Sequence, residues 1–207
     1  MPVSIPAVPG RSSWPQEIEA QLTDSAELVR ETAAAAGLLA SIAQEVADAL
    51  ASGHKVLLCG NGGSAADAQH VATELLARYK LERRALPAVS LGTDVTFLTA
   101  MSNDFAFEEV FARQVQAYGR EGDVLWAFST SGNSPNVLMA LRTARHRGMA
   151  TIGFTGASGG KLKPLVDHCL CVPSTDTPRI QEVHMAAAHV ICDLVERELA
   201  PELPAEE

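Results

Sequence analysis

The chain has 207 residues, of which 47% are hydrophobic and 20% charged, so it can bury one substantial core without dividing into separate domains. Its formal net charge of −9 at pH 7 excludes non-specific attraction to nucleic acid or to an anionic membrane, because both polyanions would be repelled. An anionic ligand would meet the same unfavourable field, so converging local hydrogen-bond donors would have to hold it.

The two ends of the chain differ from its centre in composition. Residues 1–14 are rich in proline and contain no long apolar run, which predicts a flexible arm and excludes a secretion signal or a membrane span there. Residues 15–200 are expected to form a single domain. Residues 201–207 are expected to be a C-terminal tail.

The four cysteines lie in apolar surroundings and lack the paired spacing of a zinc ribbon, which favours reduced thiols in a cytoplasmic protein. They are Cys59, Cys169, Cys171 and Cys192. Together with His168, two of them could ligate a metal. The alternation in residues 169–172 is more typical of a short strand, and we favour that interpretation.

Helical and strand-like patterns follow one another along the chain. Residues 15–31 and 32–52 are rich in Ala, Leu and Glu and have helical apolar spacing. A short apolar run, a glycine-rich turn and a helical stretch through Tyr79 come next. The strand-like runs are 55–59, 88–91, 123–128, 150–154 and 168–172, with helical stretches between and after them.

This alternation predicts an α/β fold, a doubly wound five-stranded parallel sheet flanked by helices, because each parallel crossover requires a helix. Ligands of such sheets bind beyond the carboxyl ends of the strands. The two N-terminal helices are additional to this architecture. We therefore expect their apolar faces to pack partly against another subunit.

A glycine-rich turn follows the first strand directly and opens a helix. It comprises Gly60, Asn61, Gly62, Gly63 and Ser64. Glycine lets the backbone turn sharply and approach a ligand, and a serine at a helix start supplies a hydroxyl. The spacing fits neither a dinucleotide fingerprint nor a Walker loop. Taken alone, this turn favours a binding loop and a simple tight turn equally.

A hydroxyl-rich segment ends the third strand, immediately before Pro135. Its hydroxyls belong to Ser129, Thr130, Ser131 and Ser134. Helix capping by Ser134 explains only one of them. Its position after a parallel strand favours a neutral cradle for a phosphate group.

Two pairs of possible metal ligands lie on separate predicted helices. His70 and Glu74 are four residues apart and share a helix face. Gln181 and His189 are eight apart, which at about 100° per residue leaves them roughly 80° apart around the helix axis, whereas His184 is a weaker candidate. This nitrogen and oxygen set suits zinc or a similar divalent ion. Each pair alone is more typical of a surface ion pair or a helix interface.

Asn103 and Asp104 fall between two predicted helices. This position favours a helix start, and the alternative is that the two side chains form hydrogen bonds with sugar hydroxyls.

Four motifs together resemble the phosphoheptose isomerases of the sugar isomerase (SIS) fold. They are CGNGGSAADAQH at 59–70, GREGDV at 119–124, STSGNSPNV at 129–137 and RIQEVH at 179–184, and the resemblance spans nearly the whole chain. It implies an aldose–ketose isomerase that converts sedoheptulose 7-phosphate into D-glycero-D-manno-heptose 7-phosphate through an enediol(ate), the first step of nucleotide-activated heptose biosynthesis.

The resemblance also implies site residues and partners. It implies a cytoplasmic homotetramer with active sites between subunits. It also implies one divalent ion per subunit, with Zn²⁺ as the favoured ion and another divalent metal as the alternative. Glu74 and His189 would be the acid–base pair. The implied metal ligands are His70, Glu74, Gln181 and His189. The implied substrate contacts are Asn61, Gly62, Gly63, Ser64, Glu74, Arg78, Asn103, Asp104, Ser129, Thr130, Ser131, Ser134 and Gln181. The chain has Pro178 where some relatives have Asp, so a sugar contact by that side chain is not carried over.

Other functions stay open at this stage. One is a non-catalytic binding protein of the replication-initiation regulator type, which shares the fold, although the presence of Glu74 and His189 argues against it. Another is an isomerase of a different sugar phosphate, such as arabinose 5-phosphate. The sensing domain of a transcription regulator is less favoured, because no helix-turn-helix segment accompanies the motifs.

Overall fold

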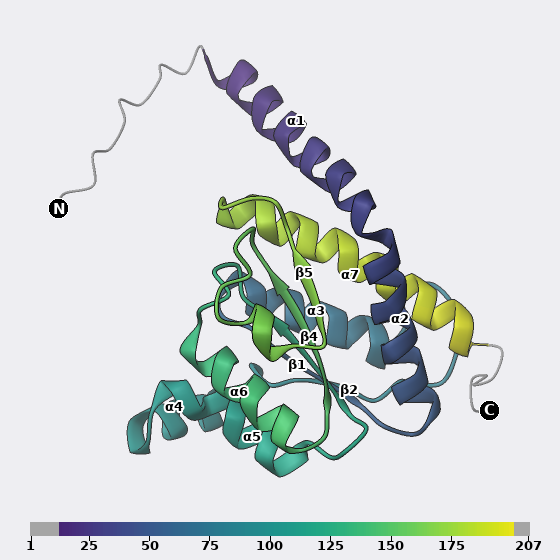
Figure 1. The fold of residues 1–207 in the computed structure, drawn as a ribbon, viewed down its shortest axis with the longest axis vertical. Helices are drawn as coiled ribbons and strands as arrows, with labels where there is room; N and C mark the ends of the chain where they lie inside the picture. Colours follow the sequence, from purple (N-terminus) through teal and green to yellow (C-terminus); the bar gives the residue numbers. More distant parts are fainter. Residues whose placement is uncertain (1–12, 201–207) are drawn as a thin grey trace.

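The computed structural model describes residues 13–200, and these residues form one five-stranded parallel sheet covered by helices on both faces (Figure 1). The expected doubly wound fold is thereby confirmed. The predicted arm, apart from its last two residues, and the predicted tail lie outside the described residues. The strands are β1 Val56–Cys59, β2 Ala88–Ser90, β3 Val124–Phe128, β4 Ala150–Thr155 and β5 His168–Cys171.

Alternating strand residues contact the two helical layers, because successive side chains of a strand point to opposite faces. Val56 and Leu58 belong to one buried cluster together with residues of α2, α3 and α7. Leu57 and Leu125 belong to a second cluster with residues of α5 and α6. The near-continuous apolar strands of the sequence are therefore buried on both faces, as the predicted parallel sheet requires.

The helices agree with the expected order. They are α1 Trp14–Thr32, α2 Ala36–Ala51, α3 Gly63–Leu76, α4 Val95–Asp104, α5 Val110–Tyr118, α6 Pro135–His146 and α7 Thr177–Leu199. Short 3-10 segments lie at Ala33–Ala35, Phe107–Glu109 and Lys163–Leu165.

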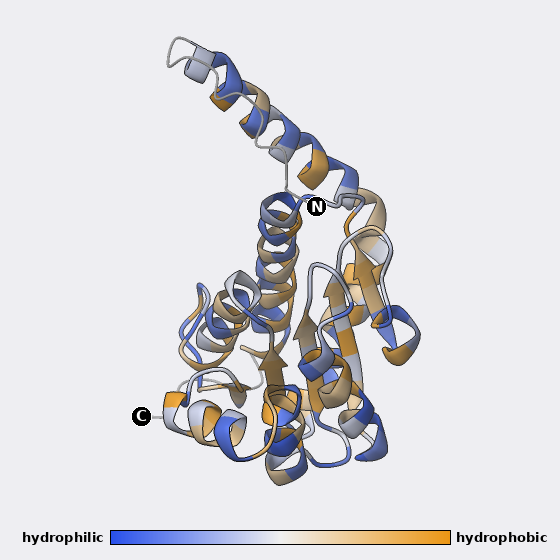
Figure 2. Cartoon of the chain, turned by 90° about the vertical axis from the view of Figure 1, so that its left-hand side faces the viewer, coloured by the Kyte–Doolittle hydropathy of each residue, from blue (hydrophilic) through white to orange (hydrophobic). Residues whose placement is uncertain are grey.

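The N-terminal helices differ in how they pack. Helix α2 buries seven residues, whereas α1 buries only Thr32 and extends away from the sheet (Figure 1). Figure 2 shows polar and apolar residues interspersed along the projecting part of α1. The helical stretch Trp14–Ala51 is long and apolar enough to cross a membrane by length and composition, a test that core helices also pass. The burial of α2 supports a core role for that half.

The strand order β2-β1-β3-β4-β5 reverses direction between β1 and β3. Ligands of open α/β sheets bind at such a switch point, outside the carboxyl ends of the strands. The turn after β1 is the glycine-rich segment, and the loop after β3 is the hydroxyl-rich segment. The two segments singled out by the sequence therefore occupy the position where this fold binds ligands.

Two local expectations are corrected by the structure. Helix α3 ends at Leu76 rather than continuing through Tyr79, because the following segment is bound to α7 by hydrogen bonds. Asn103 and Asp104 are the last two residues of α4 and thus mark a helix end rather than a start. A turn that depends on a distant partner is invisible to local periodicity.

Candidate active site

The glycine-rich turn brings backbone and side chains into close approach at the start of α3. Gly62 has a φ of 56° and is the N-cap residue, a conformation that favours glycine. A Cβ on Gly63 would lie 2.5 Å from the Gln181 amide nitrogen. Glycine at this position therefore lets the amide of Gln181, on α7, lie directly against the turn.

The hydroxyl-rich loop after β3 presents unpaired donors. Within residues 13–200, the backbone amides of Thr130, Ser131 and Ser134 donate to no protein acceptor. Ser134 is the N-cap residue of α6, but its hydroxyl makes no capping bond and lies 2.9 Å from the Ser129 hydroxyl. The capping explanation for the Ser134 side chain is therefore wrong. Free amides beside hydroxyls at a helix start are the donors that a phosphate group requires.

The two loops are joined directly to each other. Asn61 and Asn136 exchange two side-chain hydrogen bonds of 2.9 Å each. Asn136 is buried and was not among the predicted site residues, although it lies within the STSGNSPNV motif. The pattern Ser-Pro-Asn at a helix start was the available signal.

Three predicted ligands converge from α3 and α7. The Nε2 atoms of His70 and His189 lie 3.1 Å apart, and Oε1 of Glu74 lies 3.1 Å from the first and 3.9 Å from the second. The shared face of α3 follows from the four-residue spacing, and α7 packs beside α3 (Figure 1). The 3.1 Å contact between the two Nε2 atoms is a hydrogen bond only when one ring nitrogen carries the proton and the other accepts it.

The donor set and its spacing fit a divalent cation. Tetrahedral ligands with bond lengths of about 2.0 to 2.2 Å lie about 3.3 to 3.6 Å from one another, close to the distances within this cluster. The second carboxylate oxygen of Glu74, Oε2, is buried and has no hydrogen-bond partner among the described residues. Burying a carboxylate oxygen without a partner costs free energy, and a shared cation would offset that cost. Gln181, the fourth predicted ligand, contacts Gly63 in this structure.

Asp67 is a further carboxylate on α3 that sequence reasoning missed. It lies one turn before His70, and its Oδ2 is buried without a hydrogen-bond partner among residues 13–200. Burial raises the pKa of this carboxyl to about 6, against an opposing effect of His70. Its place in the motif GGSAADAQH was the only sequence signal.

The remaining predicted contacts are more exposed. Arg78, Asn103 and Asp104 are exposed, and the amide of Asn103 donates to the Asp104 carboxylate over 2.8 Å. The structure joins none of the three to the cluster by a hydrogen bond or ion pair. Their assignment as substrate contacts stays a prediction.

The alternative ligands are placed elsewhere. His184 is fully buried and lies 3.3 Å from the carbonyl of Thr155, apart from the His70 cluster. His168 and Cys169 lie on the edge strand β5, as the preferred strand interpretation predicted. The four cysteines are free, and burial raises the pKa of the Cys59 and Cys192 thiols to about 12.

Known proteins resemble this chain in both sequence and fold. The SIS domain family model matches residues 19–156. A phosphoheptose isomerase from Roseiflexus sp. is 58% identical over 81% of this chain and 85% of its own length, and one from Geobacter sulfurreducens is 57% identical over 80% and 88%. The structure of a phosphoheptose isomerase from Neisseria gonorrhoeae superposes with a TM-score of 0.84 at 40% identity, covering 89% of this chain and 99% of the other. The chain therefore belongs to the SIS domain family and, within it, to the phosphoheptose isomerases.

Proposed function

We propose that the chain, whose relatives are named phosphoheptose isomerases, converts sedoheptulose 7-phosphate into D-glycero-D-manno-heptose 7-phosphate. The observation that carries the proposal is the cluster of His70, Glu74 and His189 on the helix that follows the glycine-rich turn and on α7 beside it. An aldose–ketose isomerase needs an acid–base pair near a site that fixes the sugar. This region supplies both.

The hydroxyl-rich loop would hold the phosphate. Its free amides and the hydroxyls of Thr130 and Ser131 are neutral donors. Such donors can bind an anion through local hydrogen bonds even though the chain carries a net negative charge. Ser64, buried at the start of α3, adds a hydroxyl on the adjacent turn. Fixing the phosphate would place the sugar's reacting carbons at a defined distance from Glu74 and His189.

We further propose that one divalent cation, with Zn²⁺ as the favoured ion, is held by His70, Glu74, Gln181 and His189. When bound, such an ion supplies Lewis-acid polarisation of the sugar carbonyl. Gln181, whose amide lies against Gly63 in this structure, would be the fourth ligand.

Glu74 and His189 would act as the acid–base pair. One removes a proton from C1 and the other delivers a proton to C2, so that an enediol(ate) lies between ketose and aldose. Glu74 presents Oε1 toward the imidazoles, whereas its Oε2 is buried without a hydrogen-bond partner among the described residues. His189 meets the same space with Nε2.

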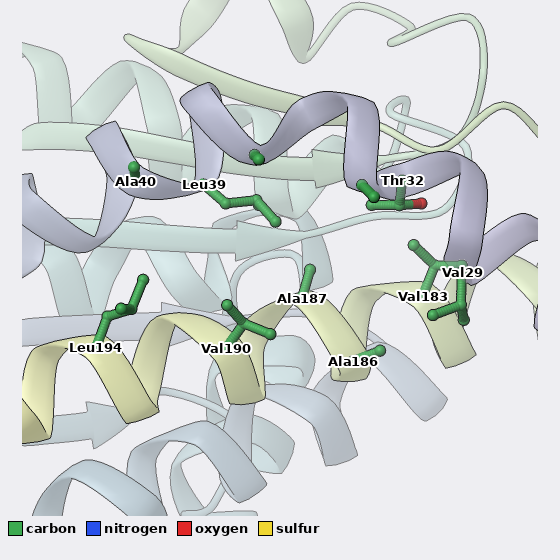
Figure 3. A pocket seen from close by; sticks show the side chains of 11 residues that line it. Val29, Thr32, Leu39, Ala40, Val183, Ala186, Ala187, Val190 and Leu194 are labelled. Atoms are coloured by element: carbon green, nitrogen blue, oxygen red, sulfur yellow. The ribbon is translucent and has the colours of Figure 1, made fainter.

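We propose a homotetramer with active sites between subunits as the working form. An apolar pocket of about 400 Å³ lies between the N-terminal helices and α7 (Figure 3), and Val29, Leu39 and Val190 line it. The projecting part of α1 exposes Ile18 by 57% and Leu22 by 66%. Apolar surface of this extent on a projecting helix is typical of subunit interfaces. Such an assembly would work in the cytoplasm, where the free thiols stay reduced.

Other functions predict different observations. A binding protein of the replication-initiation regulator type would not need the acid–base pair, and an isomerase of another sugar phosphate would turn over arabinose 5-phosphate in preference. The test is incubation of the purified protein with each sugar phosphate, with and without a chelator, followed by product analysis. We expect a heptose 7-phosphate from sedoheptulose 7-phosphate, and chelator-sensitive turnover. Absence of that product from a folded, zinc-supplemented protein would refute the proposed function.

A further inference from the structure

The imidazole of His189 is oriented without the hydrogen bond that usually fixes such a ring. Its Nε2 faces His70 and Glu74, and within residues 13–200 no group forms a hydrogen bond with its Nδ1. Metal-binding histidines usually donate the second ring N–H to a carboxylate or carbonyl, which fixes the ring orientation. Among the described residues, the groups that orient the His189 ring beyond its Nε2 contacts are therefore those packed against it.

Tyr79 supplies that packing. Its ring stacks on the His189 ring with centroids 5.7 Å apart and planes at 27°, while the edge of His70 approaches at 5.2 Å and 65°. The His189 ring is thus contacted by two other rings. Tyr79 lies in the segment 77–83, just beyond the end of α3, and is the residue through which the sequence pattern predicted continued helix.

Glu196 holds this segment against α7. Its carboxylate accepts hydrogen bonds from the backbone amides of Tyr79, Lys80 and Leu81, at 2.8, 2.6 and 2.8 Å. Glu196 lies seven residues after His189, two helical turns along the same face. Burial opposes ionisation of this carboxyl, but the three amides and Arg83 outweigh it and lower its pKa.

Arg83 extends the contact to α3. Its guanidinium pairs with Glu196 at 3.2 Å and donates to the carbonyl of Glu74 at 2.9 Å, with both charged side chains nearly inaccessible to solvent, at 0% and 2% exposure. The last turn of α3 is therefore tied to α7 at the residue that carries the candidate base. Because the desolvation cost of such a pair is several kcal/mol per ion by order of magnitude, loss of either partner would leave an uncompensated buried charge and loosen the segment.

We propose that Tyr79, held by the carboxylate of Glu196, is a positioning residue that keeps the His189 imidazole turned toward His70 and Glu74. The inference rests on the proposed function, in which these three side chains bind a divalent cation. Under this proposal the chain segment 77–83 supports the cation site through Tyr79. A merely structural role for Tyr79 would affect unfolding and leave cation affinity unchanged.

The test measures the zinc affinity of the purified full chain by competition with a chromophoric chelator. We expect Tyr79→Ala to weaken zinc binding by about 10-fold to 100-fold, the range seen when groups that orient metal ligands are removed. Tyr79→Phe keeps the ring and should keep the affinity. Tyr118→Ala, at the chain's second tyrosine on the exposed end of α5, is the matched control and should also keep it.

Kinetics separate this role from substrate binding. Because the ring of Tyr79 packs on His189, a residue of the proposed acid–base pair, Tyr79→Ala should lower kcat for sedoheptulose 7-phosphate more than it raises KM. Glu196→Gln should weaken zinc binding in the same direction, and its thermal midpoint is measured alongside because it leaves Arg83 buried without a charge partner. If Glu196→Gln does not fold, Tyr79→Ala still decides, since it leaves the ion pair intact.

The outcomes distinguish the two proposals. Zinc binding and isomerisation by the unaltered chain, with affinity unchanged in Tyr79→Ala, would overturn the positioning role and leave the proposed function standing. Equal weakening in Tyr118→Ala would also overturn it. Isomerisation without zinc binding would overturn the positioning role and the cation site together. If the folded, unaltered chain neither isomerises the sugar nor binds zinc, the proposed function is refuted as well.

Discussion

Asn61 and Asn136 lie 75 positions apart in the chain and are joined side chain to side chain by two hydrogen bonds. The Asn136 oxygen also accepts from the backbone amide of Val137, which fixes its side chain at the start of α6. This pair connects the turn after β1 with the loop after β3, on either side of the point where the strand order reverses. The relative position of the two proposed binding loops therefore depends on side chains.

Replacing Asn136 with Leu should raise the KM for sedoheptulose 7-phosphate by about tenfold or more, because a half-buried Asn61 amide is left unpaired at a cost of about 1 to 3 kcal/mol and its loop is released. Steady-state kinetics measure this change. Zinc content should stay normal, since the cluster on α3 and α7 is untouched. An unchanged KM would show that the pair does not organise the substrate site.

Replacing Glu74 with Gln should lower kcat by about 10²-fold or more, the usual contribution of a general acid or base. The amide keeps the side-chain volume, so the thermal midpoint should change little. Glu198→Gln, an exposed site in the last turn of α7, is the control and should keep full activity. Near-normal turnover by Glu74→Gln would remove this residue from the mechanism.

Replacing His189 with Ala should remove bound zinc along with activity, because one of the cluster's two imidazoles is lost. Zinc is measured by elemental analysis after dialysis against metal-free buffer. His146→Ala, at the exposed end of α6, should retain zinc. Stoichiometric zinc in His189→Ala would disprove the ligand assignment.

The fully buried His184 should make the fold sensitive to acid. Burial lowers the pKa of its imidazole from 6.5 to about 4, and the hydrogen bond with Thr155 only partly opposes this. The unfolded chain binds this proton more readily, so the contribution is complete above pH 6.5 and is lost as the pH falls toward 4. Between pH 7 and pH 5 the free energy of unfolding should fall by about 2 kcal/mol from this residue.

Urea unfolding at the two pH values tests this contribution. Because other groups titrate in the same range, the comparison is with His184→Leu, which removes the titrating ring and should show a correspondingly smaller fall. An identical fall in both proteins would assign the acid sensitivity to other residues.

Ile18→Glu or Leu22→Glu should break the proposed homotetramer, because either change puts a charge in place of an apolar side chain that α1 exposes. Sedimentation velocity should show a smaller species for either variant. Gln16→Glu adds the same charge to α1 without removing an apolar side chain and should keep the assembly. If Ile18→Glu and Leu22→Glu sediment like the unaltered protein, α1 does not form the interface.

Local patterns in the sequence determined the elements and their order. Apolar runs, glycine turns and Pro135 placed all five strands within one or two residues of their observed bounds, because each signal lies within a few neighbouring positions. The four-residue spacing of His70 and Glu74 likewise fixed their common face.

The tertiary structure decided how distant segments meet. Helix α3 ends at Leu76, and the backbone amides that follow donate hydrogen bonds to the Glu196 carboxylate. The tertiary structure also directed the Ser134 hydroxyl to Ser129 and placed Gln181 against Gly63. It also brought Tyr79 onto His189. These outcomes depend on the energies of contacts between residues far apart in the chain, and local periodicity contains no information about them.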